Sequence, residues 1–317
     1  MARLGVGLAK GRGEGAYRRA DRVLRAAAVA AGFAGFALGA APGAVASIFC
    51  AEAAGALPQQ VLRKAAPLLL AQAWVMWGAA RLQAGSQVQM CATFGALMAS
   101  QAMVTCWLAI SGRWTDWTWV PLALSFAGAV AFANFGDQIL APKASRIDIS
   151  SIQIGPVASS DLQMLYGASI LLGGCSGLGL ALIPMTMVRP LIPLKRVLEI
   201  AKAQQSLPVD GSPGSELLIL DASRLLGALL AGEAVLAFFL RSTRDAEVHR
   251  LGLQAFFLRS WLSTLIALAN QLSGVWAPAN WTDFAVCVAF LVPYAIHAQA
   301  ALPTALTFRG KSAFKED

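Results

Sequence analysis

The chain has 317 residues, of which 57% are hydrophobic and only 13% are charged. Soluble domains average roughly 25% charged residues, so this composition excludes an ordinary soluble domain. The formal net charge of +8 does not indicate nucleic-acid binding. Its lysines and arginines lie at the ends of apolar stretches and in the N-terminal arm, and not on one soluble face.

Eight apolar stretches are long enough to cross a membrane, since a spanning helix needs about 20 mostly apolar residues. Helix is the expected state of each, because hydrocarbon does not tolerate an open strand edge. We therefore predict an all-α fold, a polytopic membrane helix bundle with eight transmembrane helices. In chain order the predicted spans are 23–48, 65–82, 87–110, 119–135, 162–188, 217–240, 249–271 and 282–302.

The segments outside the spans predict the orientation of the chain. Residues 1–22 form a basic arm, and lysine and arginine are more numerous on the side of this arm than on the opposite side. This asymmetry predicts both termini on the cytosolic, matrix or stromal side. The arm and the alanine-rich run after it also fit a signal sequence or an organelle transit peptide. The predicted location is an organellar inner membrane or a thylakoid membrane.

An internal repeat relates the two halves of the sequence. Between the third and fourth spans of each half, Ser111-Gly112-x-Trp114-x4-Trp119 recurs as Ser273-Gly274-x-Trp276-x4-Trp281 at an offset of 162. In the first and fifth spans, Gly32, Gly35, Leu38 and Pro42 recur at an offset of 142 as Gly174, Gly177, Leu180 and Pro184. We interpret this as tandem duplication of a four-helix unit. The two copies should be parallel, because each has an even number of spans.

The repeat also predicts the domain boundaries. The change in offset places an insertion at 194–216, which should form a short surface helix and a loop on the side opposite the termini. The first repeat is predicted at 23–136, a linker at 137–161, the second repeat at 162–303 and a C-terminal tail at 304–317. Because the first span has a counterpart in the second half, we expect it to be a retained helix.

The pattern of this unit carries a resemblance to a known type of protein. A four-helix unit that opens with a glycine-rich span ending in proline, here Gly32, Gly35 and Pro42, resembles the small bacterial membrane proteins of the DoxX-like type. The resemblance covers both halves of the chain. It implies a helical membrane fold and no particular activity.

Small residues recur at a spacing of four on the first and fifth spans. They are Gly35, Gly39, Gly173 and Gly177. Small residues at this spacing let two helix backbones approach closely in a membrane. We predict a helix-packing role for these glycines and expect spans one and five to meet at the duplication axis. The alternative is that they reflect only the general frequency of glycine in membrane helices.

Charges within the spans mark candidate functional residues, because ionisable groups are costly in a membrane. Glu233 and Arg259 lie at matched depth on consecutive antiparallel helices, which predicts a structural ion pair. Their equivalents in the first copy, Gln72 and Ala99, are both neutral. The simultaneous gain or loss of two opposite charges favours a bridge over a proton relay, which would need a chain of titratable groups.

Aromatic and histidine side chains are candidate contacts for a pigment or another ligand. Tryptophan anchors helices at the membrane interface, and histidine can cap a helix or ligate chlorophyll or haem. We leave both interpretations open and name chlorophyll, carotenoid and lipid as candidate ligands; no metal site is predicted. The candidate contacts are His249, His297, Gln72, Trp114, Trp119, Trp276 and Trp281.

The sequence contains no recognisable catalytic motif: no nucleophile elbow, no H-E-x-x-H and no P-loop. We therefore predict a non-catalytic accessory or scaffolding subunit of a large organellar energy-converting complex, a photosystem or a respiratory complex. Its expected partners are membrane lipids and other subunits of that complex. The alternative is a transporter or channel for a small neutral or lipid-like solute, with Gln72, Glu233 and Arg259 lining the path.

Overall fold

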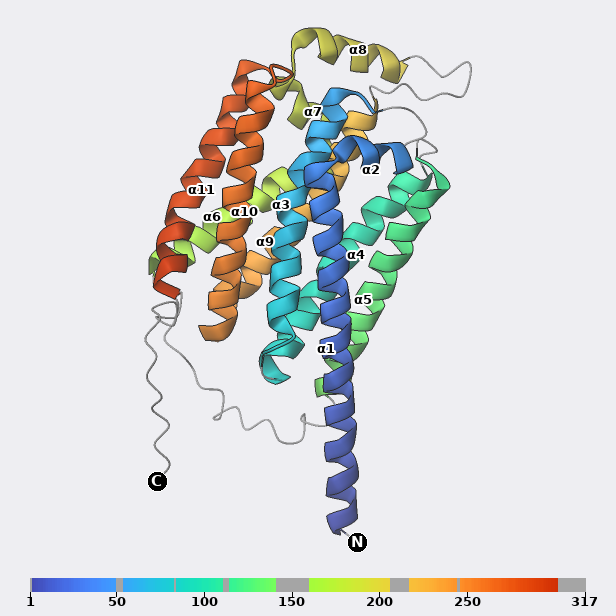
Figure 1. Cartoon of the computed structure of the whole chain (residues 1–317), viewed down its shortest axis with the longest axis vertical. Helices are drawn as coiled ribbons and strands as arrows, with labels where there is room; N and C mark the ends of the chain where they lie inside the picture. The colour runs from blue at the N-terminus through green and yellow to red at the C-terminus, as the bar shows by residue number, and fades with distance from the viewer. Residues whose placement is uncertain are drawn as a thin grey trace.

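The computed structural model describes residues 2–49, 54–82, 84–110, 114–140, 160–205, 217–243 and 246–301. These residues form helices and no strand, and most of the helices run alongside one another as a bundle (Figure 1). The predicted linker, the loop of the insertion and the C-terminal tail lie largely outside the described residues. The helices are α1 (Ala2–Ala40), α2 (Pro42–Phe49), α3 (Ala56–Ala79), α4 (Ala84–Ile110), α5 (Trp119–Leu140), α6 (Ser160–Leu182), α7 (Pro184–Val188), α8 (Leu194–Gln205), α9 (Leu218–Ser242), α10 (Ala246–Leu272) and α11 (Trp281–Ala301).

Seven of the described helices are long and apolar enough to cross a membrane: α1, α4, α5, α6, α9, α10 and α11. This number is compatible with a multi-pass integral membrane protein. The other predicted span, 65–82, falls on α3. That helix has 24 residues, or a length of about 36 Å, but it is too polar to be among the seven. The count of eight spans stays a prediction.

α3 lies among other helices, which explains how it can be more polar than they are. It packs against α1, α9 and α10, and most of its side chains are buried, Gln72 among them. α9 is placed in the same way, against α6, α4 and α3. The contact between α3 and α9 therefore forms the centre of the bundle.

The helices around this centre pack in matched sets. α1 lies on α3 and α6 lies on α9, while α4 pairs with α5 and α10 pairs with α11. The third long helix of each predicted half then crosses to the other half: α4 packs on α9, and α10 packs on α3. The two halves are consequently interlocked and do not form separate bundles.

Local breaks and loop contacts also recur between the halves. A proline begins the short helix after each first span, at Pro42 in α2 and at Pro184 in α7, since proline has no N–H to continue the preceding helix. The loop before the last helix returns to the end of this segment. The N–H of Thr115 donates to the carbonyl of Phe49 at 2.9 Å, and the N–H of Ala277 donates to that of Leu191 at 3.0 Å. The sequence repeat has these same offsets, 142 and 162.

α8 belongs to the predicted insertion and lies across one end of the bundle. This end is opposite the start of α1 (Figure 1). Val197 and Ile200 are buried against the bundle, whereas Leu194 and Leu198 are exposed. A basic helix with apolar residues on its exposed side is typical of a helix at the membrane surface.

The glycines of the first spans pack differently from the prediction. A Cβ on Gly35 would lie 2.9 Å from Leu70 of α3, and a Cβ on Gly177 would lie 2.6 Å from the backbone nitrogen of Ala231 of α9. The glycine faces of α1 and α6 therefore contact α3 and α9. The expectation that spans one and five meet each other is wrong, because each first span packs on the second long helix of its own half.

We expect Gly177→Ala to destabilise the protein by about 1–3 kcal/mol, as typical overpacking does. The added methyl would meet two backbone groups, the Ala231 nitrogen at 2.6 Å and the Gly227 carbonyl at 2.8 Å, and neither can rotate away. Thermal unfolding in detergent measures the change. Gly39→Ala is the control, because its nearest neighbour, the Ala66 methyl, lies at 3.4 Å. Equal losses in the two variants would contradict this account of the α6–α9 contact.

Candidate functional site

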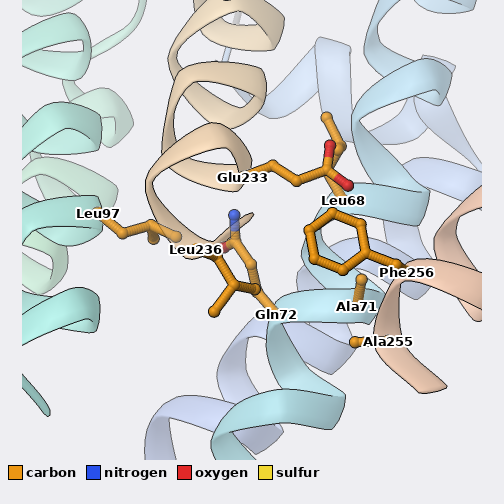
Figure 2. A pocket seen from close by; sticks show the side chains of 8 residues that line it. All are labelled: Leu68, Ala71, Gln72, Leu97, Glu233, Leu236, Ala255 and Phe256. Carbon is orange, nitrogen blue, oxygen red and sulfur yellow. The ribbon is translucent and has the colours of Figure 1, made fainter. Parts of the chain in front are cut away.

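A small pocket opens where α3, α4, α9 and α10 converge at the centre of the bundle. Figure 2 shows that most of its wall is apolar and that two polar side chains, Gln72 and Glu233, border it. Its volume is about 10 Å³, which is on the order of what a single water needs. The lining residues are Leu68, Ala71, Gln72, Leu97, Glu233, Leu236, Ala255 and Phe256.

Glu233 and Arg259 meet beside this pocket. Arg259 Nε lies 3.2 Å from Glu233 Oε1, and the two side chains are only 19% and 11% exposed. The Nε–H is not aligned for a hydrogen bond, so the contact is an ion pair held by proximity. The predicted partners are thus brought together, although α10 packs mainly on α3 and α11 and has little contact with α9. Arg259 reaches Glu233 because both residues border the centre of the bundle.

A second, neutral pair lies across the same centre. Gln101 Nε2 on α4 donates to Gln72 Oε1 on α3 at 3.2 Å, and both side chains are buried. Gln72 is the repeat equivalent of Glu233, at an offset of 161. Each half therefore contributes one polar pair from its second and third long helices. Gln101 was missed by sequence reasoning; its position beside Ser100, which is matched by Ser260 in the repeat, was the available signal.

Two of the predicted tryptophans join the halves near the end of the bundle that carries α8. Trp114 Nε1 donates to Asp221 Oδ2 on α9 at 3.2 Å, and Trp276 Nε1 donates to Gln60 Oε1 on α3. Gln60 and Asp221 are related by the same offset of 161 that relates Gln72 to Glu233. We call this pair of hydrogen bonds the cross-half tryptophan contacts, because each indole binds the second long helix of the other half.

Charged side chains surround both cross-half tryptophan contacts. Lys64 Nζ lies 4.4 Å from the centre of the Trp276 ring and forms an ion pair with Asp283 at 2.8 Å. On the other side, Arg224 forms an ion pair with Asp221 at 2.8 Å. A cation over an indole face and a buried carboxylate with two donors both strengthen a contact in low dielectric. These tryptophans consequently hold the halves together and are not simple interfacial anchors.

The remaining predicted contacts lie elsewhere on the bundle. Trp119 and Trp281 are exposed at the first positions of α5 and α11, as expected for tryptophan at a membrane interface. His249 Nε2 lies 2.9 Å from the Thr243 carbonyl oxygen. The ring of His249 stacks on Tyr166, while His297 is half-buried near the end of α11. The candidates therefore do not form one ligand site. Among the described residues, no three His, Cys, Asp or Glu side chains are grouped to hold a metal ion.

Neutralising one member of the Glu233–Arg259 pair should cost roughly 3–5 kcal/mol, because it strands the other charge in low dielectric. Replacing both with the residues of the first copy, Glu233→Gln with Arg259→Ala, should cost much less. A double-mutant cycle on thermal stability measures the coupling between the two side chains. Strictly additive losses would mean that the two side chains act independently.

Trp114→Phe should destabilise the protein by about 1.5–3 kcal/mol, the usual value of a hydrogen bond to a charged group. The substitution keeps an aromatic ring but removes the donor to the fully buried Asp221. Trp119→Phe is the matched control, because that indole is 51% exposed. Chemical unfolding in detergent gives both values, and an equal effect at the two positions would rule out the cross-half contact as the cause.

No protein-family model matches this chain, and no curated protein or solved structure shows a significant similarity to it. The resemblance to the DoxX-like type therefore stays a prediction from its glycine and proline pattern. The functional interpretation is built on the residues and contacts described above.

Proposed function

We propose that this chain is a non-catalytic accessory or scaffolding subunit of a larger membrane assembly. The observation that carries the proposal is the small size of the space at the centre of the bundle. Where four helices converge, two polar pairs and apolar side chains leave a space of only about 10 Å³. A solute path needs a wider opening than this, whereas a structural subunit needs a filled core.

The proposed architecture is two parallel repeats of four membrane-spanning helices, with α3 as the span that hydropathy alone misses. The matched helix packing, the paired proline breaks, the equivalent loop hydrogen bonds and the cross-half tryptophan contacts all support it. Each copy has an even number of spans, so both begin on the same side of the membrane. A DoxX-like origin of the unit is part of this proposal.

The outer faces of the bundle support a role in assembly. Large aromatic side chains are exposed on several helices, including Trp74 and Trp77 of α3, Trp107 of α4 and Phe33 of α1. Lipid tails, partner helices or flat pigments such as chlorophyll and carotenoid would cover such faces, because helix association in membranes relies on close packing. The proposed setting is an organellar energy-converting complex, a photosystem or a respiratory complex, with both termini on the matrix or stromal side.

One observation favours the alternative, a transporter or channel for a small neutral or lipid-like solute. Gln72 and Glu233 border the pocket where the two halves meet, and transporters with repeated halves bind their substrates near mid-membrane between those halves. Conduction would then require α3 and α9 to separate beyond their positions in this structure.

Native electrophoresis and vesicle flux together separate the two functions. From mild detergent, the chain should migrate in a particle much larger than its own 33.2 kDa. In reconstituted vesicles, Glu233→Gln should leave proton and neutral-solute flux unchanged, because a filled core offers no path. Glu247→Gln is the control, since Glu247 is 71% exposed. Migration as a monomer, with a flux that Glu233→Gln alone abolishes, would overturn the scaffold in favour of transport.

A further inference from the structure

We infer that the pocket between Gln72 and Glu233 is a binding site for one internal water molecule, which bridges the two halves of the chain at the centre of the bundle. The site goes beyond the proposed function, because it is defined by hydrogen-bonding groups that either a scaffold or a transporter would have to satisfy. It rests on three features of the pocket: a donor without an acceptor, a carboxylate with spare capacity, and the size of the space.

The donor is the side-chain amide of Gln72, which is 4% exposed. Its Oε1 accepts the hydrogen bond from Gln101, and this orients Nε2 toward the pocket. Figure 2 shows the nitrogen pointing into the space between Leu97 and Glu233. Within the described part of the chain, Nε2 has no hydrogen-bond partner. A buried amide nitrogen without an acceptor is costly, so a missing acceptor is expected in the pocket.

Glu233 supplies hydrogen-bond acceptors for the water molecule. A carboxylate has two oxygens with about four acceptor positions, and the contact with Arg259 is made to Oε1. Water both accepts and donates hydrogen bonds, so one molecule can accept from Gln72 Nε2 and donate to the Glu233 carboxylate. Two polar partners are the minimum that an internal water requires.

The dimensions of the pocket select the ligand. A volume of about 10 Å³ is on the order of the smallest space that holds one water molecule. The other lining side chains are leucine, alanine and phenylalanine, which offer no ligands to a metal cation. Because Gln72 belongs to α3 and Glu233 to α9, the bound water links the helices of the two halves where they meet.

Electron cryomicroscopy of the full chain in lipid nanodiscs, at a resolution that shows ordered water, tests the site directly. The expected map has a peak about 2.7–3.2 Å from both Gln72 Nε2 and a Glu233 oxygen. Gln72→Leu should lose the peak, and Thr105→Val should keep it, since the buried Thr105 hydroxyl bonds to α4 carbonyls away from the pocket. An empty pocket in the wild-type map, or a Gln72 amide bonded to a protein acceptor, would overturn the inference.

Radiolytic hydroxyl-radical labelling of the wild-type chain tests the same site without any variant. Radicals form from bound water, so Phe256, which lines the pocket at 2% exposure, should be modified several-fold faster than Phe94 and Phe132. These two rings are fully buried and pack on each other away from the pocket. Equal protection of all three rings would show that the pocket is dry.

Discussion

Polar side chains within hydrocarbon must find partners inside the protein. For α3, as a proposed membrane span, this requirement determines where the helix can lie. α3 carries Gln60, Lys64 and Gln72, each of which would be unsatisfied against lipid tails. In the bundle they bind Trp276, Asp283 and Gln101, which come from three other segments. Those partners belong to the loop between α10 and α11, to α11 and to α4, so α3 has to lie where these three segments can reach it. The remaining helices are then arranged around α3 and its counterpart α9; they pack apolar residues into the core and also expose large apolar side chains on the outside of the bundle.

The same requirement explains why the halves interlock. If each four-helix unit packed only on itself, Asp221 would be buried with Arg224 as a local partner but without the indole of Trp114. Exchange of α4 and α10 between the halves brings Trp114 and Trp276 each to the second long helix of the other half. Hydrogen bonds to buried side chains thus add directional contacts to an interface in which apolar surface alone provides little driving force.

Sequence reasoning predicts the helical class, the membrane-length segments and the Glu233–Arg259 contact, because hydropathy and the cost of buried charge act on single residues. It misses partners that depend on the arrangement of the halves. Trp114 and Trp276 lie 107 and 216 positions from the groups that they bind, and an indole at a helix end has the same local signature as an interfacial anchor. Gln101 is neutral, so a search for charged residues within the spans does not identify it. The glycine faces were assigned to the wrong neighbour for a related reason, since spacing identifies a close approach but not the helix that approaches.

The proposed duplication also explains why one polar pair, Glu233–Arg259, is charged while the other, Gln72–Gln101, is neutral. Gln72 and Glu233 are equivalent positions on helices that contact each other, so a glutamate at both would place two like charges beside one small pocket. Two arginines would then be needed at the positions of Ala99 and Arg259, and the pocket would have to accommodate both. A single chain can change one copy alone, which leaves a neutral amide on α3 opposite a paired carboxylate on α9. The amide of Gln72 can donate a hydrogen bond, and the carboxylate of Glu233 can accept one. A single water molecule between them can satisfy both groups, because water accepts and donates. Under the proposed duplication, the asymmetry of the pocket follows from fusing the two copies, because two identical units would impose the same residue on both sides.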